Sequence, residues 1–334
     1  MKKIKIGVLG ATGAVGREMV KVLAERSLPI SELRLLASEK SVGTKINFNG
    51  NAVTVQKADE NCFDGLDIVL GAVSNELAKK FAPFITKAGC VFIDNSSAFR
   101  MDKNTPLVVP EINPEDAFKH HGTIANPNCS TIITLMAVYK LNAISPIRSM
   151  VVSTYQAVSG AGAGGPTELD NQLQAISNGK KIENKVFQHQ IAYNLIPHIG
   201  SFCENGYTTE EMKMQNESRK ILHLPDLVVS CTCVRVPIAR SHSISANVVF
   251  ENKITVEEAA NAIKNADGCV LADEPQNNLY PMPLIASDQN LVYVGRIRKD
   301  LTNENGLTLF CCGDQIRKGA ATNAVQIAEL LLTE

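Results

Sequence analysis

The most constraining feature of the sequence is a glycine-spaced loop near its start. The run Gly7-Val-Leu-Gly10-Ala-Thr-Gly13-Ala-Val-Gly16 sits between an apolar run expected to be a strand, Ile4–Leu9, and a segment with helical spacing, Ala14–Arg26. Glycines at such a junction allow a tight turn, and the free N–H groups of the following helix can bind a pyrophosphate. The spacing is GxxGxxG and not the commoner GxGxxG, so the strand–loop–helix context carries the prediction of dinucleotide binding. The alternative is a plain tight turn.

Strands and helices alternate through the first third of the chain. Further apolar runs with the length of strands are Leu33–Ala37, Asp67–Ala72 and Cys90–Asp94, and Asn75–Ala88 has helical spacing. Alternation of this kind predicts parallel β-α units in a Rossmann-type, doubly wound parallel sheet, so the fold class is α/β.

The pattern changes after residue 129 and indicates a second, α+β domain. Helices are expected at Thr131–Leu141, Glu168–Ser177 and Thr209–Leu222, and a long β-branched strand at Ile147–Thr154. Two further strands, Leu227–Pro237 and His242–Glu251, are joined by a polar turn, and an amphipathic helix is expected at Gly319–Leu332. The glycine run Gly160–Gly165 is expected to be an internal loop.

Length and composition narrow the class of protein. A chain of 334 residues is too long for one ordinary core, and a net charge of −1 offers no general attraction to nucleic acid or to an anionic membrane. No run of 18 apolar residues predicts a membrane span, and the apolar start of the chain is too interrupted for a signal peptide. The nine cysteines lack CxxC pairs and zinc spacing, so we expect no metal and reduced thiols in a cytoplasmic protein.

The segment after the second expected strand bears on the choice between NAD and NADP. It reads Ala37-Ser38-Glu39-Lys40-Ser41, where an NAD enzyme usually places a carboxylate for the ribose. Ser38 and Ser41 can donate hydrogen bonds and Lys40 can neutralise a 2′-phosphate, which favours NADP. Glu39 is the contrary observation, because it could serve an NAD ribose or repel the phosphate. A solvated turn without a ligand is the alternative.

Cys129 is the candidate nucleophile. It follows Asn126-Pro127-Asn128 and falls at the expected start of a helix, where N–H groups and the helix dipole favour the reactive thiolate. A buried structural cysteine is the alternative.

Polar residues further along the chain are weaker candidates on their own. A loop with so few side chains as Gly160–Gly165 can pass close to a flat ligand such as nicotinamide, and Gln156 could hydrogen-bond a substrate carbonyl. Arg235 lies within an alternating strand, where a charged group usually has a partner or a function, and its planar fork suits a carboxylate. His242 can exchange a proton near neutral pH. Each of these side chains is individually more often structural.

Taken in order, the motifs resemble the aspartate-semialdehyde dehydrogenase family across nearly the whole chain. The matching segments are the glycine loop, Asp94-Asn-Ser-Ser-Ala-Phe-Arg100, Asn126-Pro-Asn-Cys129, Gln156-Ala-Val-Ser159-Gly160-Ala-Gly162, Glu210-Glu-Met-Lys213, Cys233-Val-Arg235-Val-Pro237, Arg240-Ser-His242 and Asp314-Gln315-Ile-Arg-Lys-Gly-Ala-Ala. Lys40 departs from the arginine of many relatives, and Gln315 from the asparagine of some.

The resemblance implies roles that the spacing does not show. Cys129 matches the acyl-thioester nucleophile, His242 the acid/base and Gln156 the substrate-orienting glutamine. Arg235 with Glu210 matches the groups that hold the substrate's carboxylate and amine, and Arg100, Asn128 and Lys213 match the phosphate site. The expected cofactor contacts are Gly10, Thr12, Gly13, Ala14, Val15, Ser38, Lys40, Ser41, Asn95, Ser159, Gly160 and Gln315.

The implied reaction is the reversible, NADPH-dependent reduction of 4-phospho-L-aspartate to L-aspartate 4-semialdehyde and phosphate, in lysine, methionine, threonine and diaminopimelate biosynthesis. The implied architecture is an NADP-binding domain of residues 1–128 plus 315–334, and a catalytic and dimerisation domain of residues 129–314 in a homodimer.

Two other interpretations remain open at this stage. N-acetyl-glutamyl-phosphate reductase uses the same chemistry, but its nucleophile motif tends to read NPGCY, and an acylated amine would not need a carboxylate such as Glu210. A catalytically silent NADP-binding regulator would explain the glycine loop but not the combination of Cys129, Arg235 and His242. Glyceraldehyde-3-phosphate dehydrogenase is related in mechanism, but the order of motifs fits it poorly.

Overall fold

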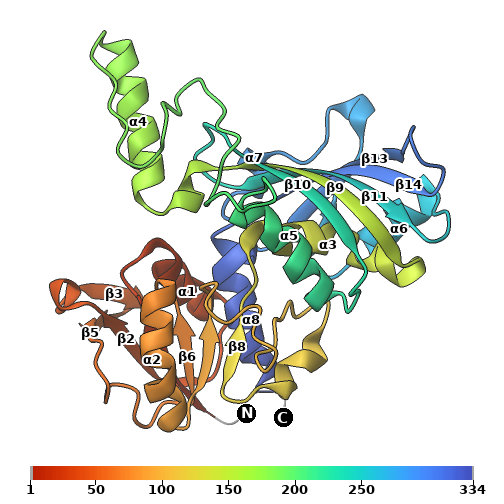
Figure 1. The fold of residues 1–334 in the computed structure, drawn as a ribbon. Helices are drawn as coiled ribbons and strands as arrows, with labels where there is room; N and C mark the ends of the chain where they lie inside the picture. The colour runs from red at the N-terminus through yellow and green to blue at the C-terminus, as the bar shows by residue number, and fades with distance from the viewer. Residues whose placement is uncertain (1–2, 333–334) are drawn as a thin grey trace. The chain divides into compact units, whose positions relative to one another are not determined.

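The computed structural model describes residues 3–332 and divides the chain into two compact units. The first unit is Met1–Asn128 with Ala320–Glu334, and the second is Cys129–Gly319 (Figure 1). Each unit has a six-stranded sheet of its own.

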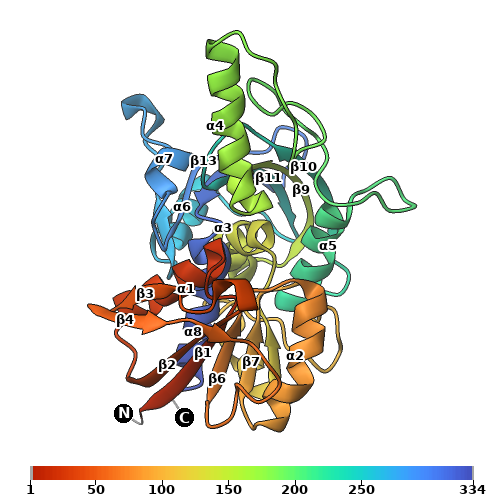
Figure 2. The same ribbon diagram turned by 90° about the vertical axis from the view of Figure 1, so that its left-hand side faces the viewer.

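The sheet of the first unit is entirely parallel, as the alternation of elements predicts. Its order, β5-β2-β1-β6-β7-β8, reverses direction at β1, so the carboxyl end of β1 lies at the position where α/β sheets bind ligands (Figure 2). The strands are β1 (Ile4–Leu9), β2 (Ile30–Ala37), β5 (Gln56–Lys57), β6 (Ile68–Gly71), β7 (Val91–Asp94) and β8 (Thr123–Ala125).

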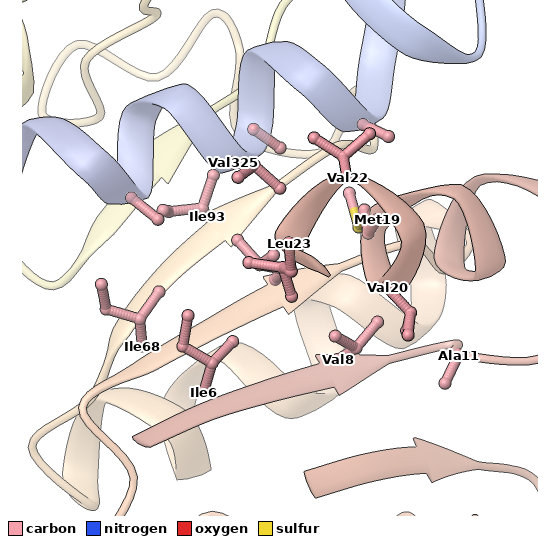
Figure 3. Packing of buried hydrophobic residues seen from close by; sticks show 14 of the residues in the cluster. Ile6, Val8, Ala11, Met19, Val20, Val22, Leu23, Ile68, Ile93 and Val325 are labelled. Carbon is pink, nitrogen blue, oxygen red and sulfur yellow. The ribbon is translucent and has the colours of Figure 1, made fainter. Parts of the chain in front are cut away.

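Helices pack on both faces of this parallel sheet. One core joins the sheet to α1 (Ala14–Glu25) and α8 (Thr322–Leu330), where Val22, Leu23 and Val325 meet (Figure 3). A second core lies on the other face beneath α2 (Asn75–Lys87) and contains Phe81 and Phe92. The smaller elements are the hairpin β3 (Lys45–Phe48) and β4 (Asn51–Thr54), and the 3₁₀ turns Glu39–Ser41 and Pro114–Lys119.

The last helix differs from the amphipathic Gly319–Leu332 that the sequence predicts. A wider π-helical turn occupies Arg317–Ala321, and α8 follows it. Six of the nine residues of α8 are buried, because the helix packs into the core of the first unit instead of lying on its surface. The structure thus gives a mostly buried helix where an amphipathic one was expected.

The sheet of the second unit is mixed. Its order is β10-β9-β11-β14-β13-β12, with β10 parallel to β9 and β11 antiparallel to it. The polar turn therefore joins β10 and β11 without making them neighbours, because β9 lies between them. The strands are β9 (Ile147–Gln156), β10 (Val228–Arg235), β11 (His242–Phe250), β12 (Cys269–Leu271), β13 (Val292–Lys299) and β14 (Gly306–Gly313).

Helices cover one face of the mixed sheet and leave its other face partly open. Figure 1 shows α3 (Cys129–Ile144), α5 (Thr209–Ile221) and α6 (Val256–Lys264) together on one face. Alternate residues of β9 are buried against them, whereas Val151 and Tyr155, which point the other way, are 58% and 38% exposed. The short helix α7 (Pro283–Ala286) and the 3₁₀ turns Val158–Ala161 and Pro275–Asn277 complete the unit.

The glycine run is only partly the loop that the sequence predicts. Residues 158–161 form a 3₁₀ turn, and α4 (Gly164–Ser177) begins inside the run, one turn earlier than expected. A Cβ on Gly165 would lie 2.0 Å from the carbonyl oxygen of Val158, so glycine lets the first turn of α4 pack against this backbone. Pro166 then fixes a helical φ in that first turn.

The boundary near the C-terminus falls five residues after the expected position 315, since the second unit extends to Gly319. The reason is that Gln315 accepts a hydrogen bond from the Ser241 N–H at 2.8 Å and Gly319 packs against Cys129, both within the second unit. Within residues 3–332, no helix combines the length and the apolar character needed to cross a lipid bilayer.

Candidate active site

The glycine loop of the first unit has the geometry of a phosphate cradle. Gly10 has φ of +86°, and a Cβ there would lie 2.3 Å from the carbonyl oxygen of Ala72. Helix α1 begins after Gly13, which makes no side-chain capping bond, and its first turn carries no acidic residue. A Cβ on Gly13 would meet only the Gly10 oxygen, at 3.4 Å. The backbone N–H groups at this helix start therefore suit the pyrophosphate of a dinucleotide.

The residues expected to contact the adenosine ribose follow β2. Ser38 and Lys40 are exposed, and the Thr12 hydroxyl donates to the Ser41 hydroxyl at 3.3 Å, which ties the glycine loop to this turn. Glu39, the residue that argued against NADP, forms an ion pair with Lys57 at 2.5 Å. Lys57 thus compensates the charge that would oppose a 2′-phosphate, and Lys40 forms no ion pair with any described residue.

Three more predicted residues lie near the carboxyl ends of β7 and β8 in the same unit. Arg100 is buried, and its guanidinium donates to the carbonyl oxygens of Asn126 and Asn95, each at 2.9 Å. The Asn126 amide donates to the Asn95 side-chain oxygen at 2.7 Å. Asn128 is also buried. The structure therefore brings Asn95 and Arg100 together.

In the second unit, the register of the mixed sheet places Gln156, Arg235 and His242 at one end of three neighbouring strands. Gln156 ends β9 and pairs with Arg235, the last residue of β10. β11 runs in the opposite direction and begins with His242 at the same end. Residues that are 86 positions apart in the sequence become neighbours because β9 lies between β10 and β11.

The backbone of Ala157 connects Arg235 and His242. Its N–H donates to His242 Nδ1 at 3.1 Å, and its carbonyl oxygen accepts from Arg235 Nη1 at 2.6 Å. A Cβ on Gly160 would lie 2.7 Å from Arg235 Nη1 and 3.3 Å from His242 Nε2, so only glycine lets the backbone pass this close to both side chains.

His242 is held neutral with its proton on a defined nitrogen. The side chain is fully buried, and burial, followed by the nearby charge of Arg235, lowers the pKa of His242 to about 3. Because Nδ1 accepts from the Ala157 N–H, the proton of the neutral ring lies on Nε2. Among the described residues Nε2 has no hydrogen-bond partner, so it can donate to a bound molecule.

Arg235 carries a buried positive charge. Burial lowers its pKa, whereas the nearby Cys129 and Glu210 raise it. The guanidinium carbon lies 5.9 Å from the centre of the Phe187 ring, a cation–π distance. A buried guanidinium beside an aromatic ring is suited to bind a carboxylate.

A hydrogen-bonded chain links Gln156 to both sides of the cluster. Its amide nitrogen donates to the hydroxyl of Ser130, which follows Cys129 in α3, and to Glu210 at 3.2 Å. Glu210 also accepts from Lys213 at 2.8 Å. These bonds leave the Gln156 carbonyl oxygen buried without a partner among the described residues. The available atom is thus an acceptor, which suits a hydroxyl or an ammonium group instead of the carbonyl that we expected.

Cys129 is the first residue of α3 and is partly exposed, whereas Cys90, Cys231, Cys233 and Cys311 are buried. A Cβ on Gly319 would lie 2.9 Å from the Cys129 Cβ, so this glycine permits the observed position of the cysteine. Ser130, the next residue of α3, accepts from Gln156, and Gln156 is the strand partner of Arg235, so the start of α3 lies beside the cluster.

The remaining predicted cofactor residues of the second unit are Ser159 and Gln315. The Gln315 amide donates to the Ser159 hydroxyl and accepts from the Ser241 N–H at 2.8 Å. Ser159 in turn donates to the Ala239 carbonyl at 2.5 Å. In this structure both side chains connect the turn before His242 to the turn after Gln156, and their contact with a cofactor stays a prediction.

Comparisons with known proteins agree with this arrangement. Residues 5–120 match the NAD-binding domain of semialdehyde dehydrogenases, and residues 140–318 match their dimerisation domain. The aspartate-semialdehyde dehydrogenase of Aquifex aeolicus is 51% identical over 99% of this chain and 98% of its own length. That of Synechocystis is 49% identical over 98% and 97%. The chain belongs to the aspartate-semialdehyde dehydrogenase family.

Solved structures of the family share the whole fold. Aspartate semialdehyde dehydrogenase II from Vibrio cholerae has a TM-score of 0.96 at 43% identity, over 100% of this chain and 99% of that one. A second structure of the Vibrio cholerae enzyme, at 42% identity, is a complex with ASA. Membership of the family makes this chain an oxidoreductase of amino-acid biosynthesis.

Family motifs alone did not identify every residue that organises the site. Gly319 occurs in a quoted motif and Ser130 directly follows another, but their contacts with Cys129 and Gln156 depend on the fold. Phe187 lies outside those motifs, and Ala157 acts through its backbone N–H and carbonyl, which no side-chain pattern can show.

Proposed function

We propose that this chain is an aspartate-semialdehyde dehydrogenase that reduces 4-phospho-L-aspartate with NADPH through a thioester on Cys129, reversibly. The observation that carries the proposal is the cluster around Ala157. A neutral histidine and a buried arginine both bind the backbone of this one residue, and Gln156 joins the cluster to Ser130, next to Cys129. The bound nicotinamide cofactor supplies the hydride of the reaction.

Cys129 acts as the nucleophile. Its thiolate attacks the acyl carbon of the substrate, a C–S bond forms, and phosphate leaves with the bonding electron pair. The start of α3 and the Arg235 charge both favour an anionic sulfur. The Cys129 backbone N–H and the Asn128 amide are assigned to the oxyanion, where losing one donor typically costs on the order of 10²–10³ in rate.

His242 controls the proton on the reacting oxygen. With its pKa near 3 in the ligand-free chain, the ring begins as a neutral hydrogen-bond donor through Nε2. Arg235 is the second cause of that low value, and a substrate carboxylate bound to Arg235 offsets its charge. Substrate binding therefore relieves this second cause and raises the pKa of His242, while burial, the larger cause, remains. The Nε2–H then gives its proton to the reacting oxygen or takes it back.

The remaining polar groups bind the ends of the substrate. Arg235 binds the α-carboxylate, while Glu210 and the unpaired Gln156 oxygen accept from the α-ammonium group. A free amine is thus favoured over an acylated one, which argues against N-acetyl-glutamyl-phosphate. We assign phosphate binding to Arg100, Asn128 and Lys213, as the family resemblance implies.

The cofactor assignment is NADP. Gly10, Gly13 and the start of α1 fit a pyrophosphate, and Lys40 is the cation available for a 2′-phosphate beside the compensated Glu39. A reduced, partly exposed thiol at Cys129 suits the cytoplasm, where we expect the enzyme to act.

We further propose that two copies associate through the open face of the mixed sheet. Val151 and Val228 are 58% and 56% exposed there, and the tilted rings of Tyr155 and Phe310 lie with their centres 6.4 Å apart. Apolar side chains gathered on one sheet face are typical of an interface. Light scattering of the wild type and of Val151→Glu tests this, with a dimer and a monomer as the expected results.

The activity is tested by phosphate-dependent reduction of NADP⁺ with L-aspartate 4-semialdehyde. Parallel assays use NAD⁺ and N-acetyl-glutamate 5-semialdehyde. We expect turnover that requires phosphate and is fastest with NADP⁺ and the free-amine substrate. Equal or faster turnover of the acetylated aldehyde would contradict the substrate assignment, and no turnover of either would favour the silent binder.

A further inference from the structure

A buried pair of polar side chains on α4 holds the segment that carries Phe187. Glu168 is 6% exposed and Gln172, one helical turn later, is 1% exposed, and the Gln172 amide donates to the Glu168 carboxylate at 3.3 Å. Neither residue belongs to the cluster around Ala157. Figure 1 and Figure 2 both show the segment after α4 running back along this helix.

The Glu168 carboxylate accepts three consecutive backbone N–H groups of this segment. Lys185 donates at 2.7 Å, Phe187 at 3.2 Å, and Val186 also donates. An ionised carboxylate that accepts several N–H groups forms strong, charge-assisted bonds and fixes the local backbone. Glu168 therefore sets the position of the Phe187 main chain directly.

Gln172 extends the same support further along the segment. Its carbonyl oxygen accepts from the N–H groups of Ile191 and Ala192, at 2.9 and 3.0 Å. Phe187, Ile191 and Ile196 then form a small apolar cluster with α4. On another side, Glu168 and Val186 line a cavity of about 580 Å³. Hydrogen bonds to Glu168 therefore hold a part of the segment that has open space on one side.

The segment held by α4, from Lys185 to Ile196, borders Arg235 in two places. The Phe187 ring lies 5.9 Å from the Arg235 guanidinium carbon, and the backbone of Ile196 pairs with that of Arg235 through bonds of 3.0 and 2.9 Å. The guanidinium is otherwise oriented by its bond to the Ala157 carbonyl. A change in the Phe187 position would thus alter the plane that Arg235 presents to a carboxylate.

We propose that Glu168 is a positioning residue, which sets the affinity for the substrate's carboxylate by holding Phe187 against Arg235. The inference rests on the proposed function, in which Arg235 binds that carboxylate. It predicts a defect that is selective for one end of the substrate, whereas general loosening of the fold would weaken every ligand.

The test is steady-state kinetics of Glu168→Gln in the full-length enzyme. The glutamine amide has one acceptor in place of two, so it cannot accept all three N–H groups. We expect KM for aspartate semialdehyde to rise roughly 10-fold, equivalent to about 1.4 kcal/mol, with kcat and the KM values of NADP⁺ and phosphate within about twofold of wild type. The kcat/KM for butanal, which has no carboxylate, should not change.

Two further variants separate positioning from folding. Phe187→Leu removes the ring and leaves Glu168 intact, so it should give the same selective rise, and the double variant should be no worse than either single one. Asp273→Asn is the matched control, because Asp273 also accepts two backbone N–H groups, from Arg296 and Ile297 at 2.8 and 3.0 Å, away from Arg235. Its kinetics should match wild type.

The outcomes distinguish failure of the proposed function from failure of the positioning role of Glu168. If wild type does not oxidise aspartate semialdehyde, the proposed function fails before any variant is made. If wild type is active but Glu168→Gln changes every KM alike, the positioning role is overturned. It is also overturned if the effects of Glu168→Gln and Phe187→Leu on KM multiply in the double variant, or if activity toward butanal falls to the same degree.

Discussion

The two units organise their functional groups in opposite ways. In the first unit, the predicted cofactor loop is made of backbone and glycine, and its residues are close in sequence and partly exposed. In the second unit, Gln156, Arg235 and His242 are buried side chains that come from three strands. A local backbone cradle can bind a cofactor common to many proteins, whereas specific chemistry depends on the register of a whole sheet.

This difference leads us to expect separable effects of substitution. Changes in the glycine loop should alter cofactor binding, and changes around Ala157 should alter chemistry without altering cofactor binding. The following substitutions test this separation.

Cys129→Ala should have the largest effect. It removes the nucleophile, so we expect kcat to fall by at least about 10⁴-fold. The dissociation constant of NADPH, measured from the change in NADPH fluorescence on binding, should equal that of the wild type. Near-full turnover of this variant would disprove the thioester mechanism, and lost NADPH binding would break the separation between the units. Cys203→Ala, at another partly exposed cysteine, is the control and should keep wild-type activity.

His242→Asn should lower kcat by about 10²–10⁴-fold, because it removes the group that handles the proton. The low pKa of His242 also makes the stability of the wild type depend on pH. The folded pKa of about 3 lies below the ordinary value near 6.5, so the unfolded chain takes up the proton first as the pH falls. The wild type should therefore lose up to about 1.4 kcal/mol of unfolding free energy per pH unit from this group between these values. Urea unfolding at several pH values measures the slope, which His242→Asn should reduce.

Gly10→Ala should weaken cofactor binding and stability without changing the reactivity of Cys129. The added Cβ would lie 2.3 Å from the Ala72 oxygen at a φ of +86°, so the cradle must deform. We expect the NADPH dissociation constant to rise more than about 10-fold and the melting temperature to fall by several degrees. The alkylation rate of Cys129 by iodoacetamide should stay unchanged, and a large drop in that rate would show that the units are not functionally separable.

Ser130→Ala tests the chain of bonds behind Gln156. Without the hydroxyl, Gln156 keeps only its bond to Glu210, and its free oxygen is less well oriented. We expect kcat/KM for the semialdehyde to fall roughly 10-fold, with Ser130→Thr retaining most of it because the hydroxyl is kept. Equal losses in both variants would point to packing and not to the hydrogen bond.

Lys40→Ala should have the smallest effect and the most selective one. Lys40 is exposed, so its interaction with a 2′-phosphate is screened by solvent. We expect KM for NADPH to rise a few-fold, by roughly 0.5–1 kcal/mol, with KM for NADH unchanged. Equal changes for both cofactors would remove Lys40 from the 2′-phosphate site.

Local signals predicted the first unit better than the second. The strand β1 and the start of α1 coincide with the expected residues, because tight turns and periodicity act over a few positions. The turn Asn49-Gly50, with φ of 51° and 82°, marks the unpredicted hairpin β3–β4 and could have been read from the sequence. The order of β9, β10 and β11 could not, since strand neighbours are chosen by long-range pairing.

The candidate site shows the same limit. Motifs named Cys129, Gln156, Arg235 and His242, and the structure places the last three at one sheet end. Sequence reasoning could not show that the ring of His242 has its proton on Nε2, because that depends on a contact with a backbone N–H. Pro166 could have placed the start of α4, since proline is frequent in a first helical turn.

The return of α8 to the first unit has a consequence for how the protein is made. Val325 and its neighbours complete the core beside β1 and β6, yet they are synthesised almost 200 residues after Asn128. While the ribosome is still making the second unit, the nucleotide-binding unit lacks part of its hydrophobic interior. Its nascent form must then persist, incomplete and exposed to chaperones and proteases, until translation of the chain is nearly over.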